Sequence, residues 1–243
     1  MALLGLVLIG IAALLMAGAG PAYRAGVLSL GAAFDTLRYG AFTAIGAGAL
    51  GLVALAIGTW RRDLRPALIG GLVVVSTLGL MIVPLLHWQQ AQAVPPIHDI
   101  TTDTEDPPAF EALVAAREKA PNAVAYPGAK TARQQREAYP DIGPLDVQAP
   151  LPVVLEAAKA EVRDFGWALA AVTDDTIEAT ATTTWFGFQD DIVIRLREEE
   201  DSVRVDMRSA SRVGRSDVGT NAARIRAYLD ALEHRLDASP ESN

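Results

Sequence analysis

The fold is decided first by residues 1–23, MALLGLVLIGIAALLMAGAGPAY, which contain no Asp, Glu, Lys or Arg. Residues 39–60 and 66–97 share this property. A helix needs about 20 apolar residues to cross the roughly 30 Å hydrocarbon core of a bilayer. The sequence therefore predicts a three-helix membrane anchor over residues 1–93, with spans near 2–19, 40–59 and 66–86.

An alternative for the first span is a cleaved signal peptide, with Ala17-Gly18-Ala19 as the cleavage site. A signal peptide begins with positively charged residues, and residues 1–23 contain none. A retained span is therefore favoured, and the alternative stays open.

The loops predict the orientation of the spans. The short loop 61–66 holds three arginines and one aspartate, whereas the longer loop 20–38 holds two arginines. Because cytoplasmic loops carry an excess of Lys and Arg, we expect the N-terminus inside and everything after the third span outside the cytoplasm. The alanine- and arginine-rich composition suggests a bacterium, so the expected location is the inner (cytoplasmic) membrane.

Charge separates the two halves of the chain and excludes one class of partner. Residues 1–93 carry five arginines and two aspartates, a net of +3; since the whole chain carries −8, residues 94–243 carry −11. A nucleic-acid-binding surface needs a net basic footprint, so nucleic acid is not expected as a partner. The chain has no cysteine, which excludes disulfides and thiolate chemistry.

Residues 94–150 are expected to form an extended arm that packs on the final domain. Ten of the fourteen prolines lie between Pro95 and Pro152. Proline lacks an N–H group and restricts the residue before it, so long helices and central strands are disfavoured. Apolar residues such as Phe110 and Tyr139 give the arm anchors that a solvated tether would lack.

Residues 151–238 predict an α+β domain, followed by a disordered tail at 239–243. Apolar residues at spacings of three and four predict helices from 151 and near 219–236. Alternating residues predict four strands between them. The element order α-β-β-β-β-α indicates a four-stranded antiparallel sheet with two helices on one face. The predicted strands cover 167–172, 176–183, 192–197 and 203–208.

Several segments of the soluble half resemble a known bacterial family of membrane-anchored proteins. They are the sequences at 95–103, 139–142, 185–191 and 208–217. Together they are similar to the domain of unknown function 1499, over residues 94 to 233, with a looser similarity in the membrane half. The resemblance implies no activity, substrate or catalytic residue.

The segment from Arg208 to Asp217 is the main candidate site. It combines arginines with serine hydroxyls just before the last helix, and such a helix start attracts anions. A phospholipid head group, phosphate or a sugar acid would fit it. The alternative is that the arginines pair with Asp190, Asp191, Asp206 and Asp217, because arginine forks pair well with carboxylates. The candidate residues are Arg208, Ser209, Ser211, Arg212, Arg215 and Asp217.

An aromatic turn lies between two of the predicted strands. Trp185 and Phe186 could form a surface tip that contacts the membrane interface or stacks on a ligand. The alternative is a corner that folds its rings into the core.

No metal or cofactor is predicted. His98, Asp99 and Asp103 could ligate a hard cation such as calcium. However, their spacing matches no calcium loop, and Pro107-Pro108 follow at once. A hydrogen-bonded turn is therefore the favoured interpretation.

The sequence favours a binding protein over an enzyme. It contains no Gly-rich phosphate loop, no nucleophile elbow and no paired-histidine zinc motif. The favoured function is a non-enzymatic envelope module that contacts the lipid bilayer and binds an anionic lipid, a polysaccharide or another membrane protein. The alternative is a hydrolase or transferase of envelope material that uses His98.

Overall fold

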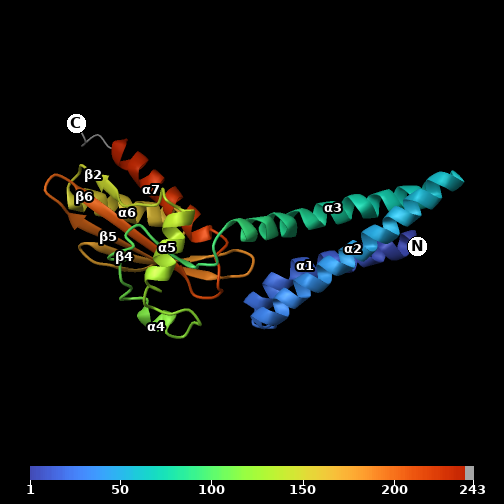
Figure 1. The fold of residues 1–243 in the computed structure, drawn as a ribbon, viewed down its shortest axis with the longest axis horizontal. Helices are drawn as coiled ribbons and strands as arrows, with labels where there is room; N and C mark the ends of the chain where they lie inside the picture. Colours follow the sequence, from blue (N-terminus) through green and yellow to red (C-terminus); the bar gives the residue numbers. More distant parts are fainter. Residues whose placement is uncertain (239–243) are drawn as a thin grey trace. The chain divides into compact units, whose positions relative to one another are not determined.

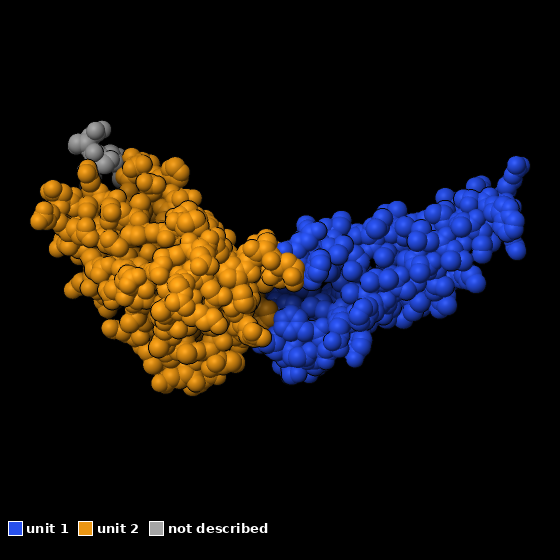
Figure 2. All heavy atoms as spheres, viewed as in Figure 1, with its two compact units in different colours: residues 1–89, 184–187 blue, residues 90–183, 188–243 orange. Residues whose placement is uncertain are grey.

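The computed structural model describes residues 1–238 (Figure 1). The chain forms two compact units, coloured separately in Figure 2. The first comprises Met1–Gln89 and Thr184–Gly187; the second comprises Gln90–Thr183 and the chain from Phe188 onward. The tail expected at 239–243 lies outside the described residues.

Three helices make up most of the first unit: α1 (Ala2–Arg24), α2 (Leu30–Arg61) and α3 (Leu64–Ala93). Each is long enough and apolar enough to cross a membrane. They extend past the predicted spans, and α1 continues through Pro21. Their length and composition indicate a membrane protein, as the charge-free stretches do.

Small residues allow α2 and α3 to approach closely. A Cβ atom added at Gly70 would lie 2.5 Å from the carbonyl oxygen of Gly51, and one added at Gly58 would lie 2.6 Å from the amide nitrogen of Ala67. Helices in lipid associate through such close packing, because burial from water offers no driving force between them there.

The second unit contains a six-stranded antiparallel sheet, which corrects the expected four strands. Its main path runs β1-β6-β5-β4-β3, and β2 also pairs with β6. The strands are β1 (Asp99–Thr101), β2 (Leu145–Val147), β3 (Ala168–Val172), β4 (Thr176–Thr182), β5 (Gln189–Glu198) and β6 (Val203–Ser211).

The two additional strands come from the proline-rich arm. Both β1 and β2 are three residues long and pair with β6. Proline prevents long strands in the arm, but three residues fit between prolines and satisfy backbone groups that β6 would otherwise leave unpaired.

Helices α6 (Leu151–Asp164) and α7 (Thr220–Asp237) cover one face of the sheet (Figure 1). The arm covers the other face with the short helix α4 (Val114–Arg117), and α5 (Ala129–Ala138) follows it in the chain. Two helices therefore lie on one face, as the element order predicts, and the arm covers the other.

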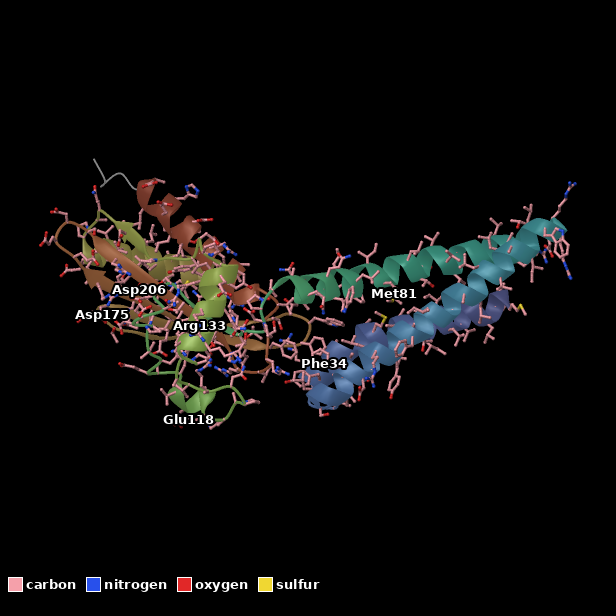
Figure 3. The ribbon with its side chains drawn as sticks, viewed as in Figure 1. Phe34, Met81, Glu118, Arg133, Asp175 and Asp206 are labelled. Atoms are coloured by element: carbon pink, nitrogen blue, oxygen red, sulfur yellow. The ribbon has the colours of Figure 1, made fainter. Side chains whose placement is uncertain are left out.

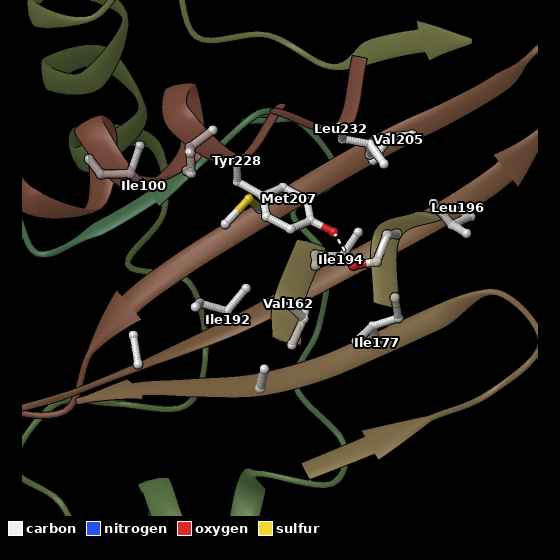
Figure 4. Close-up of a cluster of buried hydrophobic side chains, with 14 of the residues drawn as sticks. Ile100, Val162, Ile177, Ile192, Ile194, Leu196, Val205, Met207, Tyr228 and Leu232 are labelled. Carbon is white, nitrogen blue, oxygen red and sulfur yellow. Dashed lines mark hydrogen bonds between the residues drawn. The ribbon is translucent and has the colours of Figure 1, made fainter. Parts of the chain in front are cut away.

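The face under α6 and α7 is apolar (Figure 4). Ile192 and Ile194 on β5 and Met207 on β6 are fully buried there. Tyr228 of α7 is also fully buried, and its hydroxyl donates a hydrogen bond to the Ala158 carbonyl at 2.9 Å. Because side chains alternate along a strand, the residues between these point to the arm.

Candidate functional site

The arm face of the sheet is a layer of buried ion pairs, which we call the charged layer. Arg208 of β6 donates from Nε and Nη2 to the two carboxylate oxygens of Asp99 on β1, at 2.9 and 2.8 Å. It also donates to the carbonyls of Pro108 and Val124. Arg208 is 2% exposed and Asp99 1%. A two-pronged pair of this kind is geometrically specific as well as strong.

A second pairing in the charged layer centres on Asp191 of β5, which is fully buried. Arg117 of α4 donates to one carboxylate oxygen at 3.1 Å, and Arg212 donates to both at 2.9 and 2.8 Å. The Thr180 hydroxyl donates a further bond at 2.8 Å. Burial lowers the pKa of the fully buried Arg117, although Asp191 opposes that shift.

An aromatic ring separates the two pairings. The guanidinium carbons of Arg117 and Arg208 each lie 4.7 Å from the centroid of the Phe110 ring. The ring therefore attracts both cations by the cation–π effect. Tyr126 also contacts Arg208, and burial raises the pKa of its hydroxyl to about 12.

Asp206 of β6, labelled in Figure 3, organises the half-exposed border of the charged layer. Arg195 and Arg197 donate to its Oδ2 at 3.1 and 2.6 Å. Arg197 also reaches Asp103 at 3.3 Å. Burial alone would raise the pKa of Asp103, but hydrogen bonds from backbone N–H groups and from Arg197 lower it below its usual value.

A buried carboxylate attaches the arm to β4. Glu178 is 3% exposed and accepts hydrogen bonds from the backbone N–H groups of Glu111, Ala112 and Leu113, at 2.8 to 3.0 Å. These donors lie just before and at the N-cap of α4, and the carboxylate gives each of these backbone N–H groups a partner. The arm is thereby attached to the sheet by charge as well as by apolar contacts.

The start of α7 holds a separate polar network on the opposite face. Asp217 accepts from the backbone N–H groups of Gly219 and Asn221 at 3.0 and 2.7 Å. The Ser209 hydroxyl donates to the Asn221 side chain at 2.7 Å, and Asn221 donates to the Ser211 hydroxyl at 3.0 Å. Burial raises the pKa of Asp217 above its usual value despite the two N–H donors.

The six residues of the predicted anion site do not converge. Arg208 and Arg212 lie in the charged layer, whereas Ser209, Ser211 and Asp217 lie in the network at α7. Arg215 is exposed, and no hydrogen bond or ion pair joins it to the residues that the structure describes. The segment crosses from one face to the other because β6 alternates its side chains.

The carboxylates considered for a metal are engaged with other groups. Asp99 binds Arg208, and Asp103 accepts from the backbone N–H groups of Glu105 and Asp106 at 2.9 Å. Among the described residues, no group of three or more His, Cys, Asp or Glu side chains could hold a metal ion. The His98 carbonyl accepts from Ser211 and Asn221, while its buried Nδ1 atom has no hydrogen-bond partner.

The two aromatic residues of the turn lie in the first unit and differ in exposure. Phe186 is 8% exposed and stacks on Phe34, with ring centroids 5.7 Å apart. Trp185 is 43% exposed, and its indole nitrogen donates to the carbonyl of Ala17 at 3.1 Å. Phe186 is therefore buried against a neighbouring ring, whereas Trp185 is partly exposed.

An open hollow lies away from all of these residues. It measures about 740 Å³ and is bordered by the loop 198–202 and the start of α6. Four consecutive carboxylates, Glu198 to Asp201, line it. Its charge therefore disfavours an anionic occupant.

Sequence reasoning missed the arm's contribution to the charged layer. Arg117 gives no signal, because it is one of several charged residues in a loop-rich segment. Glu178 gives a faint signal, as the only charge within the strand Thr176–Thr182. Its partners, 67 to 65 residues away, could not be inferred from the strand.

Comparison with known proteins identifies the family and no function. No protein with a curated description is similar to the chain. The family model described as "Protein of unknown function (DUF1499)" matches residues 99–232, which include the charged layer, the network at α7 and all six strands. That match spans more than half of the chain and confirms the family that the sequence motifs resemble. The chain belongs to the DUF1499 family of proteins of unknown function.

Proposed function

We propose that this protein is a membrane-anchored, non-enzymatic module that binds an extended segment of another membrane protein along β3. The observation that carries the proposal is the chemistry of that strand. Ala168–Val172 contains no charged residue and no proline, and it ends the sheet, with no strand from the described residues 1–238 on its outer side. Leu169 is 43% exposed and Val172 36%.

Edge strands in soluble domains are usually protected, because their free N–H and C=O groups pair with other chains. The opposite edge of this sheet is protected, since β1 and β2 cover β6. On β3 the protection consists only of a register shift between Leu169 and Ala171. Strand addition would satisfy the free backbone groups, while Leu169 and Val172 would contact alternate side chains of the bound segment.

Charge favours a particular kind of segment. Residues 94–243 carry a net charge of −11, and β3 is followed by Asp174 and Asp175. An apolar segment flanked by basic residues would complement this surface. A second copy of the chain would bring the same acidic surface and is disfavoured.

The hydrogen bonds of the candidate residues support binding over catalysis. Ser209 and Ser211 bond to Asn221 rather than to the His98 ring. Asp99, next to His98, is held by Arg208. A hydrolase or transferase that used His98 would need a partner to orient its ring.

We place the module outside the cytoplasm of a bacterial cell, in its inner membrane. Three spans put the two ends of a chain on opposite sides, and the three arginines of loop 61–66 favour the cytoplasm for that loop. A reporter that is active only outside the cytoplasm, fused after Asn243, should give signal. Silence from it, with signal from a cytoplasmic reporter, would reverse the orientation.

Photocrosslinking in cells tests the binding strand. A photoreactive residue at Leu169 or Val172 of the full chain should give a discrete adduct with one membrane protein, and a control at the exposed Glu233 should not. Ala170→Lys should remove the adduct, because a charge on an edge strand blocks pairing. Ala170 is exposed, so the fold should be retained.

Three outcomes would overturn the proposal. The first is adducts at Leu169 and Val172 that do not exceed those at Glu233. The second is an adduct that survives Ala170→Lys. The third is an adduct only between two copies of this chain, which would replace the partner with self-association.

A second candidate function is anion binding at the loop that contains Arg215. The supporting observation is the exposure of this arginine, whereas Arg208 and Arg212 are held by carboxylates. A phospholipid head group or a sugar acid would pair with its guanidinium.

A further inference from the structure

The first unit contains an aromatic cluster, and the inference drawn from it does not depend on the segment proposed to bind along β3. The cluster consists of Trp185, Phe186, Tyr23 and Phe34. Phe186 lies 5.9 Å from Tyr23 and 5.7 Å from Phe34, measured between ring centroids, and Trp185 meets Phe186 edge-on at 5.0 Å. Tyr23 lies in the last turn of α1 and Phe34 near the start of α2, so the cluster marks one end of this helix pair.

Trp185 packs against a position on α1 that only glycine can occupy. A Cβ atom at Gly20 would lie 2.8 Å from the indole nitrogen, so only glycine leaves room for the ring. The indole N–H donates to the Ala17 carbonyl at 3.1 Å, and Arg24 donates to the Thr184 carbonyl at 2.9 Å. The turn Thr184–Gly187 is therefore held by three kinds of contact: close packing, hydrogen bonds and ring stacking.

The outer surface of the cluster remains exposed and apolar. Trp185 is 43% exposed, and Phe34, labelled in Figure 3, is 51% exposed. Other apolar side chains of α1 and α2 are also exposed, such as Leu14 at 76% and Phe42 at 63%. Arg24 and Arg38 lie beside it in the sequence. Exposed rings at the end of a span, next to arginines, are typical of the bilayer interface.

We infer that the turn Thr184–Gly187 inserts Trp185 into the head-group region of the bilayer, where it serves as an interfacial anchor in addition to the three helices. An indole suits this region because its ring is apolar and its N–H is polar. Here the N–H is already bonded to Ala17, so the exposed ring contacts lipid at little cost in unpaired polar groups. The proposed occupant is lipid at the boundary between head groups and acyl chains.

Depth-dependent fluorescence quenching tests the inference in the full chain. The chain has four tryptophans, so replacing Trp60, Trp88 and Trp167 with Phe leaves Trp185 as the only emitter. The protein is reconstituted in phosphatidylcholine vesicles whose acyl chains carry bromine near the head group or near the chain end. We expect a larger loss of emission with bromine near the head group.

Two glycine variants sharpen the measurement. Gly20→Ala should displace the indole and change the quenching, because the new methyl group would overlap the ring. Gly18→Ala is the matched control, since a Cβ atom there meets nothing within 4 Å. A single-Trp167 protein is the second control, because that ring stacks on Tyr228 at 5.3 Å, within the second unit.

Three results would overturn the inference. Strong quenching of Trp185 by aqueous iodide, with none by bromine, would make the turn a solvated loop. Quenching that is strongest near the chain end would place the ring in the hydrocarbon core. Resistance to both agents would mean that another protein surface covers it.

Discussion

On the α6–α7 face of the sheet, Ile194 and Met207 are fully buried among hydrocarbon side chains, whereas on the arm face Asp191 and Arg208 are equally buried among charges. Apolar burial is non-directional, so its contribution depends mainly on the area removed from water. A buried ion pair contributes only when both partners and their hydrogen bonds are present. The two faces should therefore respond differently to substitution, although both are closed to solvent.

The largest effect is expected from removing one partner of the Asp99–Arg208 pair. Arg208→Met should cost about 3–5 kcal/mol of unfolding free energy, because Asp99 is left buried without its cation. Denaturant titration of the full chain in detergent measures it. The double variant Asp99→Leu with Arg208→Met should recover a large part of the loss. If Arg208→Met were as stable as the parent, the expected difference between the two faces would be wrong.

Two near-isosteric substitutions compare the faces directly. Asp191→Asn should cost about 1.5–3 kcal/mol, since its hydrogen bonds to Arg117 and Arg212 lose their charge. Ile194→Val, one methylene smaller on the opposite face of the same strand, should cost about 0.5–1.5 kcal/mol. Denaturant midpoints at unchanged slope give both values. Equal costs would mean that the depth of burial, and not whether the side chain is charged or apolar, decides how much stability a substitution removes.

The pH dependence of stability should have opposite signs at two aspartates. The folded-state pKa of Asp217 is raised by burial, so its contribution to stability is present at low pH and is lost as pH rises through that folded pKa. The folded-state pKa of Asp103 is lowered, so its contribution is present at higher pH and is lost as pH falls through that folded pKa.

Thermal melts across the acid range, with Asp217→Asn and Asp103→Asn each compared with the parent, measure these contributions. The melting temperature of the parent minus that of Asp217→Asn should fall as pH rises. The corresponding difference for Asp103→Asn should fall as pH decreases. Curves that slope in the same direction would contradict the assignment.

The smallest effect on stability is expected at Arg215. Arg215→Ala should change the free energy of unfolding by no more than about 0.5 kcal/mol, because the side chain is exposed. If the loop binds anions, short-chain phosphatidylglycerol should raise the melting temperature of the parent more than phosphatidylcholine does. The variant should lose that difference, while Lys130→Ala, the same change of charge at an exposed position of α5, should keep it. Identical responses of the two variants would exclude Arg215 as the anion contact.

The regular elements were largely predictable from local patterns. The helix expected from residue 151 is α6 (Leu151–Asp164), and the helix expected near 219–236 is α7 (Thr220–Asp237). The strands with alternating side chains correspond to β5 and β6, although both are longer than predicted. In each case the period of the apolar residues is a property of neighbouring positions.

The two short strands and the charged layer were not predictable in the same way. A strand of three residues such as β1 or β2 has too few positions to show a period. Arg208 and Arg212 stand out in the sequence as part of a group of arginines, but the choice between an anion and a carboxylate as their partner depends on what lies opposite them. Arg117 was not selected, because its role depends on the course of the arm.

The sequence by itself determined the three long apolar helices, because hydrophobicity over about 20 residues is a local property of the chain. It also determined the apolar face of the sheet, through side chains that alternate along β5 and β6. Only the tertiary structure decided which carboxylate each arginine meets. Asp99 and Arg208 are separated by 109 residues, and bringing them together depends on β1 pairing with β6. Pairing between such distant segments depends on the whole fold, so no local pattern encodes it.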